Sequence, residues 1–208
     1  MLPLDILIPF FLASVLLALS PGPDNIFVLT QSALNGKLAG LAVTMGLCTG
    51  LIFHTLAVAF GVAVIFQTSA MAFTVLKICG AAYLLFLAWQ AFRASAAAIE
   101  AINNGGRNFW QLYRRGIIMN VTNPKVSIFF LAFLPQFADP VRGSLTLQII
   151  GLGGVFIVAT ILIFGGISLL AGMIRQRLYG SEKAQRILNR IAGTVFVALA
   201  VNLVIMKQ

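Results

Sequence analysis

The chain has 208 residues, of which 60% are hydrophobic and only 9% are charged, and its mean hydropathy is +1.01. Soluble proteins carry about a quarter charged residues, so the composition excludes an ordinary soluble domain and indicates an integral membrane protein. The net charge of +9 does not indicate nucleic-acid binding, because the basic residues lie between apolar runs and no basic face is interleaved with exposed aromatic residues.

Six apolar segments follow one another along the chain, each near the ~20 residues that a helix needs to cross a bilayer core. The connections are mostly short, and the longest contains the turn-forming run "NNGG" at residues 103–106. No soluble domain fits between the segments. We therefore predict an all-α integral membrane protein, a single transmembrane domain of residues 1–208, with spans at about 4–33, 38–66, 70–93, 110–137, 146–173 and 187–206.

Lysine and arginine residues are distributed unevenly between the two sides of these spans. One side carries ten of them, at positions 37, 93, 107, 114, 115, 175, 177, 183, 186 and 190, and the other side carries two, at 142 and 207. Because cytoplasmic loops are enriched in Lys and Arg, we expect the basic side to be cytoplasmic and both termini to face outward.

Two of the spans are interrupted by proline and polar residues near their middle. "LSPGPDNIF" interrupts the first span and "NVTNPKVSIFF" the fourth, and Pro23 and Pro124 are 101 residues apart, close to half the chain. Each half then holds three spans, which is the arithmetic of an inverted repeat. We predict repeats of about 1–103 and 104–208, each with a broken first helix.

Each interruption is expected to start a new half-helix within the membrane. Proline suits the first helical position, so one half-helix starts at Pro21 or Pro23, with Ser20 or Gly22 as its N-cap. The other starts at Pro124, with Asn123 as its N-cap. Such starts expose free N–H groups, and unpaired backbone at that depth is tolerated only inside the protein or beside water. We expect the breaks to face each other across a central cavity.

Ionisable residues are few inside the spans, and two of them directly follow the prolines. Asp24 follows Pro23, and Lys125 follows Pro124. A charge near the bilayer centre is expensive and usually marks a pathway, a pair or a proton relay. Asp24 carries a proton, holds the ammonium of a zwitterion whose carboxylate lies at Lys125, or pairs with Lys125. The sequence does not decide between these roles.

Other polar residues in the spans are weaker candidates. Asn25, Asn120 and Asn123 serve either as caps for freed backbone groups or as substrate contacts, and Gln31 follows them on the first broken helix. His54 is a candidate proton relay, because histidine is the side chain that changes charge near physiological pH, but a hydrogen bond within the bundle is the more common role of such a residue. A further set comes from the third span: Lys77, which either snorkels or neutralises Asp24, and Tyr83, which is deep enough to line the cavity.

No sequence motif indicates an enzyme or a cofactor. The chain has no H-E-x-x-H, G-x-S-x-G or P-loop, and no cluster of cysteine and histidine indicates a metal site. We predict no catalytic residues, no cofactor and no metal. Without an ATP-binding motif, uphill transport requires an ion gradient.

Three stretches, "SPGPDNIFVL", "LKICGAAYLLFLAW" and "RRGIIMNVTNPKVSIFFLAFLPQF", together resemble the lysine exporter (LysE/RhtB) family of bacterial amino-acid exporters. The resemblance runs nearly end to end. It implies a multi-pass protein of the bacterial inner membrane that exports amino acids or close derivatives, coupled to proton uptake. The family's motif residues fall on Pro21, Gly22, Pro23, Asp24, Asn25, Asn123, Pro124 and Lys125. The family's members handle basic, neutral and small hydroxylated amino acids, so the resemblance does not fix the substrate.

Three hypotheses follow from the sequence. The first is a secondary exporter whose partners are an amino acid, protons and membrane lipid. The second is a channel or transporter for a metal ion or another small solute, which has few ligands available. The third is a membrane scaffold or intramembrane enzyme. Small-residue faces, such as the one around Gly46 and Gly50, permit a homodimer without requiring one.

Overall fold

The computed structural model describes residues 2–20, 22–68, 70–93, 108–171 and 181–205. These residues form helices and contain no strand, which agrees with the all-α prediction. The α-helices are α1 (Leu4–Leu19), α2 (Pro23–Asn35), α3 (Lys37–Thr68), α4 (Ala70–Arg93), α5 (Phe109–Val121), α6 (Pro124–Ile128), α7 (Leu145–Leu169) and α9 (Glu182–Ile205). A π-helical turn η1 (Phe129–Phe133) and a 3-10 turn η2 (Leu134–Phe137) continue α6, and a second 3-10 turn, η3 (Pro140–Arg142), precedes α7.

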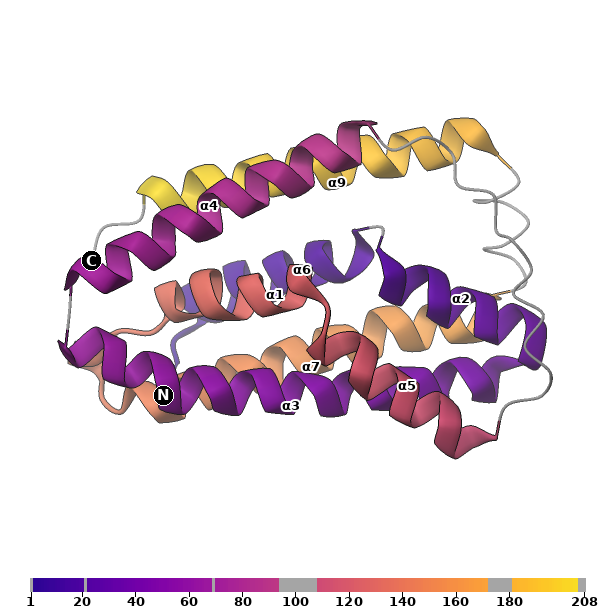
Figure 1. The fold of residues 1–208 in the computed structure, drawn as a ribbon, viewed down its shortest axis with the longest axis horizontal. Coiled ribbons are helices and arrows are strands. Elements are labelled where there is room, and N and C mark those ends of the chain that lie inside the picture. The colour runs from indigo at the N-terminus through magenta and orange to yellow at the C-terminus, as the bar shows by residue number, and fades with distance from the viewer. Residues whose placement is uncertain (1, 21, 69, 94–107, 172–180, 206–208) are drawn as a thin grey trace.

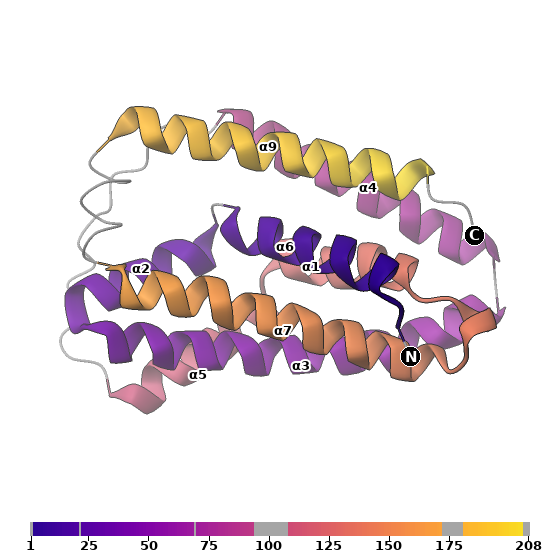
Figure 2. The ribbon, with the colours of Figure 1, turned by 180° about the vertical axis from the view of Figure 1, so that it is seen from behind.

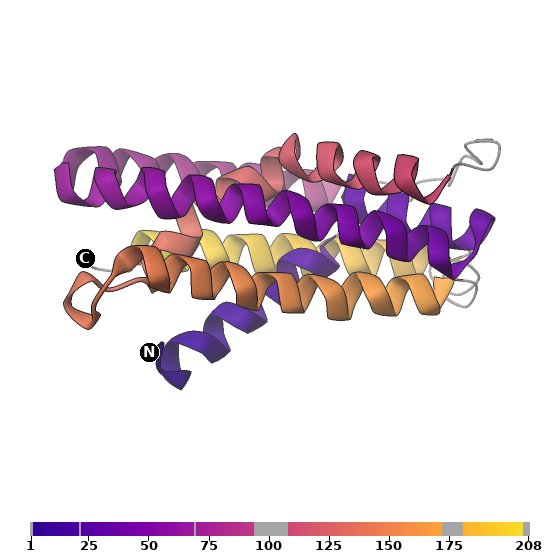
Figure 3. The same ribbon diagram turned by 90° about the horizontal axis from the view of Figure 1, so that it is seen from below.

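The helices run roughly along one long axis (Figure 1). The start of α1, the η2–η3 turns and the end of α9 lie at one end of the molecule, whereas α2 ends and α3, α5 and α9 begin at the other (Figures 1 and 2). The broken helix α5–α6 therefore runs in the opposite direction to the broken helix α1–α2. The two helices α4 and α9 lie side by side along one face of the molecule, and α3 and α5 pack together on another (Figure 3).

Four of the predicted spans have the length and composition to cross a membrane. Lys37–Gly61 of α3 and Leu145–Leu169 of α7 meet this criterion alone. Two bent pairs meet it together: α1 with α2, at 63°, and α5 with the segment Pro124–Phe137, at 50°. Among the described residues α4 and α9 do not meet it, and the apolar part of α9, Asn189–Val201, is shorter. The number of spans in the structure is therefore two, or four with both pairs counted.

The first helix has an apolar face on the surface of the protein. Large hydrophobic side chains recur on α1 every third or fourth residue and are between 36% and 71% exposed: Leu4, Ile8, Leu12, Leu16 and Leu19. Soluble monomers rarely expose such contiguous apolar patches. The opposite face of α1 is buried, with Phe10 and Leu17 in the larger of two hydrophobic cores. This division is the one expected of a helix between lipid and a protein core.

Small residues let α3 and α5 approach closely. A Cβ added to Gly116 of α5 would lie 2.5 Å from the carbonyl oxygen of Val43 and 3.0 Å from the Cα of Gly46. A side chain at either glycine would therefore collide with backbone. Glycine at both positions brings the two backbones together, as is common where lipid supplies no hydrophobic drive for helix association.

Several sequence predictions fall on residues outside the described ranges. These are Pro21, Arg107, Arg175, Arg177, Lys207 and the expected boundary between repeats at residues 103 and 104. Lys37 begins α3, at the end of the molecule where α2 ends (Figure 1), and Arg93 ends α4, which runs toward that end.

Candidate functional site

The first helix break leaves backbone carbonyls without their usual donors. In a continuous helix, residues 21 and 23 would donate to the carbonyls of Leu17 and Leu19, but both are prolines and have no N–H. Helix α1 ends at Leu19, and α2 begins at Pro23 with Gly22 as an N-cap that makes no side-chain bond. Of the two predicted starts, Pro21 and Pro23, the structure has the second. The break therefore creates acceptors in the interior that need donors from elsewhere.

Lys125 of the second broken helix supplies two of these donors. Its ammonium Nζ donates to the carbonyl oxygens of Leu17, at 3.3 Å, and Ser20, at 3.1 Å. The lysine is only 7% exposed, and a Cβ at Gly22 would lie 3.1 Å from Nζ. Glycine at position 22 thus makes room for the lysine as well as breaking the helix. Another carbonyl of this turn, on Ala18, accepts a 2.7 Å bond from Asn25 Nδ2.

The second break is held by Asn123 and by a histidine from the first half of the chain. Asn123 Oδ1 accepts a hydrogen bond from the backbone N–H of Lys125 at 3.0 Å, which confirms Asn123 as the N-cap of a helix that starts at Pro124. Pro124 cannot donate to the carbonyl of Asn120. That oxygen instead accepts from the Asn123 backbone N–H, at 3.1 Å, and lies 3.2 Å from His54 Nε2.

Asn123 also joins the two breaks, since its Nδ2 donates to Asp24 Oδ2 at 2.8 Å. The opposite charges of Asp24 and Lys125 attract each other. Within the described residues, however, no ion pair of 4.0 Å or less connects them. Asn123 thus connects the Asp24 carboxylate to the Lys125 backbone, while the Lys125 ammonium bonds carbonyls of the first break. The two breaks meet through these side-chain contacts, and the expected central cavity stays a prediction.

Several buried oxygens at the two breaks have no hydrogen-bond partner within the described chain. They are Ser20 Oγ, Asp24 Oδ1, Asn25 Oδ1 and Asn120 Oδ1. All four residues are at most 7% exposed. Buried polar atoms are normally paired, and each unpaired one costs about 1–3 kcal/mol. Because the carboxylate and amide oxygens only accept, these positions favour a ligand or water that brings N–H or O–H donors.

The other residues predicted from the sequence lie at varying distances from this cluster. Gln31 is fully buried and lies seven residues after Asp24, on the same face of α2. Its Oε1 accepts from Asn35 at 2.8 Å, and its Nε2 has no partner among the described residues. Tyr83 and Lys77 are half-buried on α4, and the ring of Tyr83 lies tilted against that of Phe86, with 6.0 Å between the ring centres. No described hydrogen bond joins Tyr83 to the breaks.

Two functional elements were not predicted from the sequence: the Leu17 and Ser20 carbonyls that hold Lys125, and the close approach of Gly22 to Nζ. The sequence contains a signal for the orphan carbonyls. Leu17 lies four residues before Pro21, and proline has no N–H to donate to the Leu17 carbonyl. The identity of the replacement donor depends on tertiary packing between the halves.

Residues 15–207 match the family model described as "LysE type translocator". The chain belongs to this family. The match covers both breaks and confirms the resemblance drawn from the three quoted stretches. It places the chain among transmembrane transport proteins, and the family is one of translocators rather than enzymes.

Named relatives support the same membership. The chain is 36% identical over 192 residues to the "Homoserine/homoserine lactone efflux protein" of Salmonella typhimurium, covering 90% of each chain. It has the same identity and coverage with the protein of that name from Salmonella typhi. An "Uncharacterized membrane protein" of Vibrio cholerae is 28% identical over 95% of this chain and 96% of its own. No solved structure matches the chain.

Proposed function

We propose that the chain exports amino acids or close derivatives across the bacterial inner membrane as a secondary transporter, by antiport with protons. Family membership and relatives named for homoserine and homoserine lactone efflux support the class of substrate. The observation that carries the proposal is the buried cluster at which both helix breaks meet, with one anion, one cation and unpaired acceptor oxygens.

The proposed substrate site lies between the two broken helices. An α-amino acid brings an ammonium with three donors and a carboxylate with acceptors only. The ammonium matches Asp24 Oδ1 and the amide oxygens of Asn25 and Asn120. The carboxylate matches the ammonium of Lys125 together with the positive end of the α2 helix dipole. The proposed site also includes Asn123, whose Nδ2 donates to Asp24. Tyr83 is its last proposed member.

The proposed topology has six spans in two inverted repeats, 1–103 and 104–208. The opposite directions of α1–α2 and α5–α6 in Figure 1 support it. The basic end of the molecule would then be cytoplasmic by the positive-inside rule, with both termini outside. The two breaks would lie near the bilayer midplane, where inverted-repeat transporters place their sites.

Protons are proposed as the coupling ion because Asp24 is the buried carboxylate of the site and has one unpaired oxygen. A carboxylate that is protonated from outside and deprotonated inside would bind an ammonium only when ionised. Proton and ammonium would then compete for one group. Such competition couples export of the amino acid to entry of the proton.

The experiment is efflux from proteoliposomes loaded with homoserine, lysine or alanine. Efflux of at least one amino acid should accelerate when an inward proton gradient is imposed and return to the basal rate with a protonophore. Asp24→Asn keeps an acceptor for Asn123 Nδ2 and should abolish the response to the gradient. Lys37→Gln, which removes an exposed charge at the start of α3, is the matched control and should export normally.

Two results would contradict the proposal. One is release of all three amino acids at the rate of protein-free liposomes, especially if loaded Zn²⁺ or another small solute is released instead. The other is unchanged gradient-driven efflux in Asp24→Asn, which would remove Asp24 from proton coupling.

A further inference from the structure

A cavity of about 480 Å³ lies at the end of the molecule where α1 begins and α9 ends. We call it the α1–α9 cavity. Its walls come from α1, from the η1–η2 turns with the two residues that follow, and from α9: Asp5, Ile6, Pro9, Ala13, Phe133, Gln136, Phe137, Ala138, Asp139, Ala198 and Leu199. Its volume falls within the range of small-molecule sites, about 300–1,000 Å³.

The α1–α9 cavity lies between the two broken helices that also form the proposed substrate site. On α1 its lining residues Asp5, Pro9 and Ala13 recur every four residues along one face. That face continues to Leu17, whose carbonyl binds Lys125. The cavity and the site therefore lie at successive turns along the same face of α1.

A cluster of phenylalanines separates the two positions. The ring of Phe133, which lines the cavity, lies 4.8 Å from that of Phe129, one helical turn after Lys125. Phe10 of α1 lies 5.2 Å from Phe137 and 6.1 Å from Phe129. All four rings are buried. Phe129 and Phe133 are the first and last residues of a π-helical turn, an irregularity that is frequent at functional sites. In this conformation the rings pack against one another between the cavity and Lys125.

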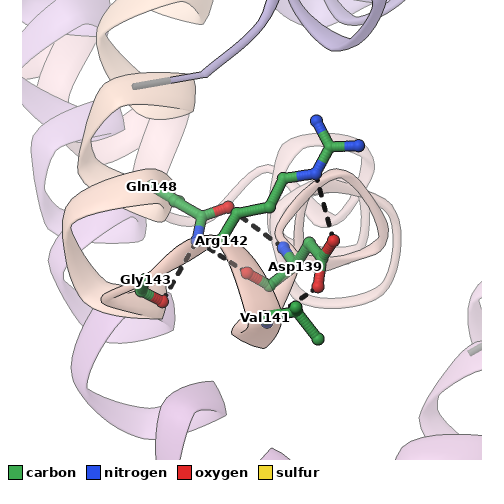
Figure 4. Close-up of polar contacts among 5 residues, drawn as sticks. All are labelled: Asp139, Val141, Arg142, Gly143 and Gln148. Carbon is green, nitrogen blue, oxygen red and sulfur yellow. Dashed lines mark hydrogen bonds and ion pairs between the residues drawn. The ribbon is translucent and has the colours of Figure 1, made fainter.

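The polar groups of the α1–α9 cavity select for a cation. Asp139 is neutralised, because its Oδ2 pairs with Arg142 Nε at 3.1 Å and its Oδ1 caps Val141 (Figure 4). Asp5, in contrast, is exposed and has no ion-pair partner among the described residues. Gln136 Nε2 bonds its own helix at 3.4 Å, so its carbonyl oxygen is available. The cavity thus offers an unpaired carboxylate and an amide oxygen, both acceptors.

The rim of the cavity is rigidly held. Gln148 of α7 bonds both ends of the loop from Asp139 to Gly143 (Figure 4). Its Oε1 accepts from the Asp139 backbone N–H at 3.0 Å, and its Nε2 donates to the carbonyls of Asp139, at 2.8 Å, and Gly143, at 3.2 Å. A wall fixed in this way maintains the shape of the opening while the phenylalanine cluster rearranges.

We infer that the α1–α9 cavity is an outer release site, where Asp5 and Gln136 hold the ammonium group of the exported amino acid after it has passed the phenylalanine cluster. The inference rests on the proposed function, because it takes the substrate from the Asp24–Lys125 site. It adds a second binding position with its own recognition residues and an opening on the outer face.

The test uses a cysteine at the floor of the cavity. Ala13→Cys is made in the full chain carrying Cys48→Ala and Cys79→Ala, and spheroplasts are treated with impermeant cationic or anionic methanethiosulfonates. We expect the cationic reagent to react faster. Asp5→Asn should lower the ratio of the two rates about three-fold, since Asp5 lies two helical turns, ~12 Å, from Ala13 and its charge acts with opposite sign on the two reagents. Outside homoserine should slow the labelling several-fold, and Asp5→Asn should remove that protection.

A matched control is Leu12→Cys, on the neighbouring but 54% exposed apolar face of α1. It should show neither the charge preference nor protection. If Ala13→Cys does not react, or reacts without protection by homoserine, lysine or alanine while the same protein exports one of them from proteoliposomes, the release site is wrong and the proposed function stands. If none of these is exported, the proposed function fails whatever the labelling shows.

Discussion

The interaction between Asp24 and Lys125 can be tested through stability. Lys125→Met keeps most of the apolar stem but removes the ammonium and its bonds to the Leu17 and Ser20 carbonyls. It also leaves Asp24, which is 2% exposed, without its nearby cation. Removing one partner of a buried charge pair typically costs ~3–5 kcal/mol, so we expect a loss of that size in the free energy of unfolding.

The coupling energy follows from the separation. The ammonium and carboxylate are more than 4.0 Å apart, and two unit charges at 4 Å interact by about 4 kcal/mol at an effective dielectric constant of ~20. Doubling the separation halves this energy. The double variant Asp24→Asn/Lys125→Met should therefore be more stable than the sum of the single losses predicts, by roughly 2–4 kcal/mol.

Unfolding in mixed detergent and dodecyl sulfate micelles, followed by far-ultraviolet circular dichroism, measures all four members of this cycle. Asp24→Asn combined with Lys37→Met is the matched control cycle, and distant sites should add within about 0.5 kcal/mol. If the Asp24 and Lys125 losses are equally additive, the two residues do not interact and Lys125 acts only as a cap for carbonyls.

Three further predictions concern single positions. Gly116→Ala should lower stability by about 1–3 kcal/mol through overpacking of α3 against α5, seen as a lower melting temperature in detergent; Gly154→Ala, where a Cβ meets nothing within 4 Å, should not. Gln148→Ala should expose the loop at residues 138–143 to limited proteolysis, unlike the control Gln111→Ala on the exposed start of α5. His54→Gln preserves a donor for the second break, so gradient-driven efflux should stay within about three-fold of the unchanged protein; complete loss would indicate a proton relay instead.

The helix breaks were predictable from the sequence because proline chemistry is local. A missing N–H and a fixed φ act within one turn, so Pro23 and Pro124 located the starts of α2 and α6, and Asn123 located a cap. The position of α9 was less predictable. Its expected start at residue 187 is five residues late, because Glu182 and the residues after it form a polar helical turn. Such residues favour a helix, but they lack the apolar run from which the spans were predicted.

The partners of the site residues could not be predicted in the same way. The sequence aligned Asp24 with Lys125 by symmetry, yet the lysine reaches back to the Leu17 and Ser20 carbonyls while Asn123 contacts Asp24. Which donor satisfies which orphan carbonyl depends on the register between α1 and α6. That register is set by the packing of rings such as Phe10 and Phe129, and no local rule contains it.

Each helix break has a carbonyl that contacts a side chain from the other half of the chain. This arrangement relates substrate binding to separation of the two halves. The Leu17 carbonyl, freed in the first half, is bound by Lys125 of the second, and the Asn120 carbonyl, freed in the second, lies beside His54 of the first. Separating the halves would leave the Leu17 carbonyl without its donor, at about 1–3 kcal/mol, and would leave the Asn120 carbonyl only its bond from the Asn123 backbone N–H. A substrate carboxylate that draws Lys125 away would offset part of that penalty only while it is bound. Because a ligand shifts an equilibrium only by its differential affinity, the empty carrier should stay locked and the loaded carrier should open.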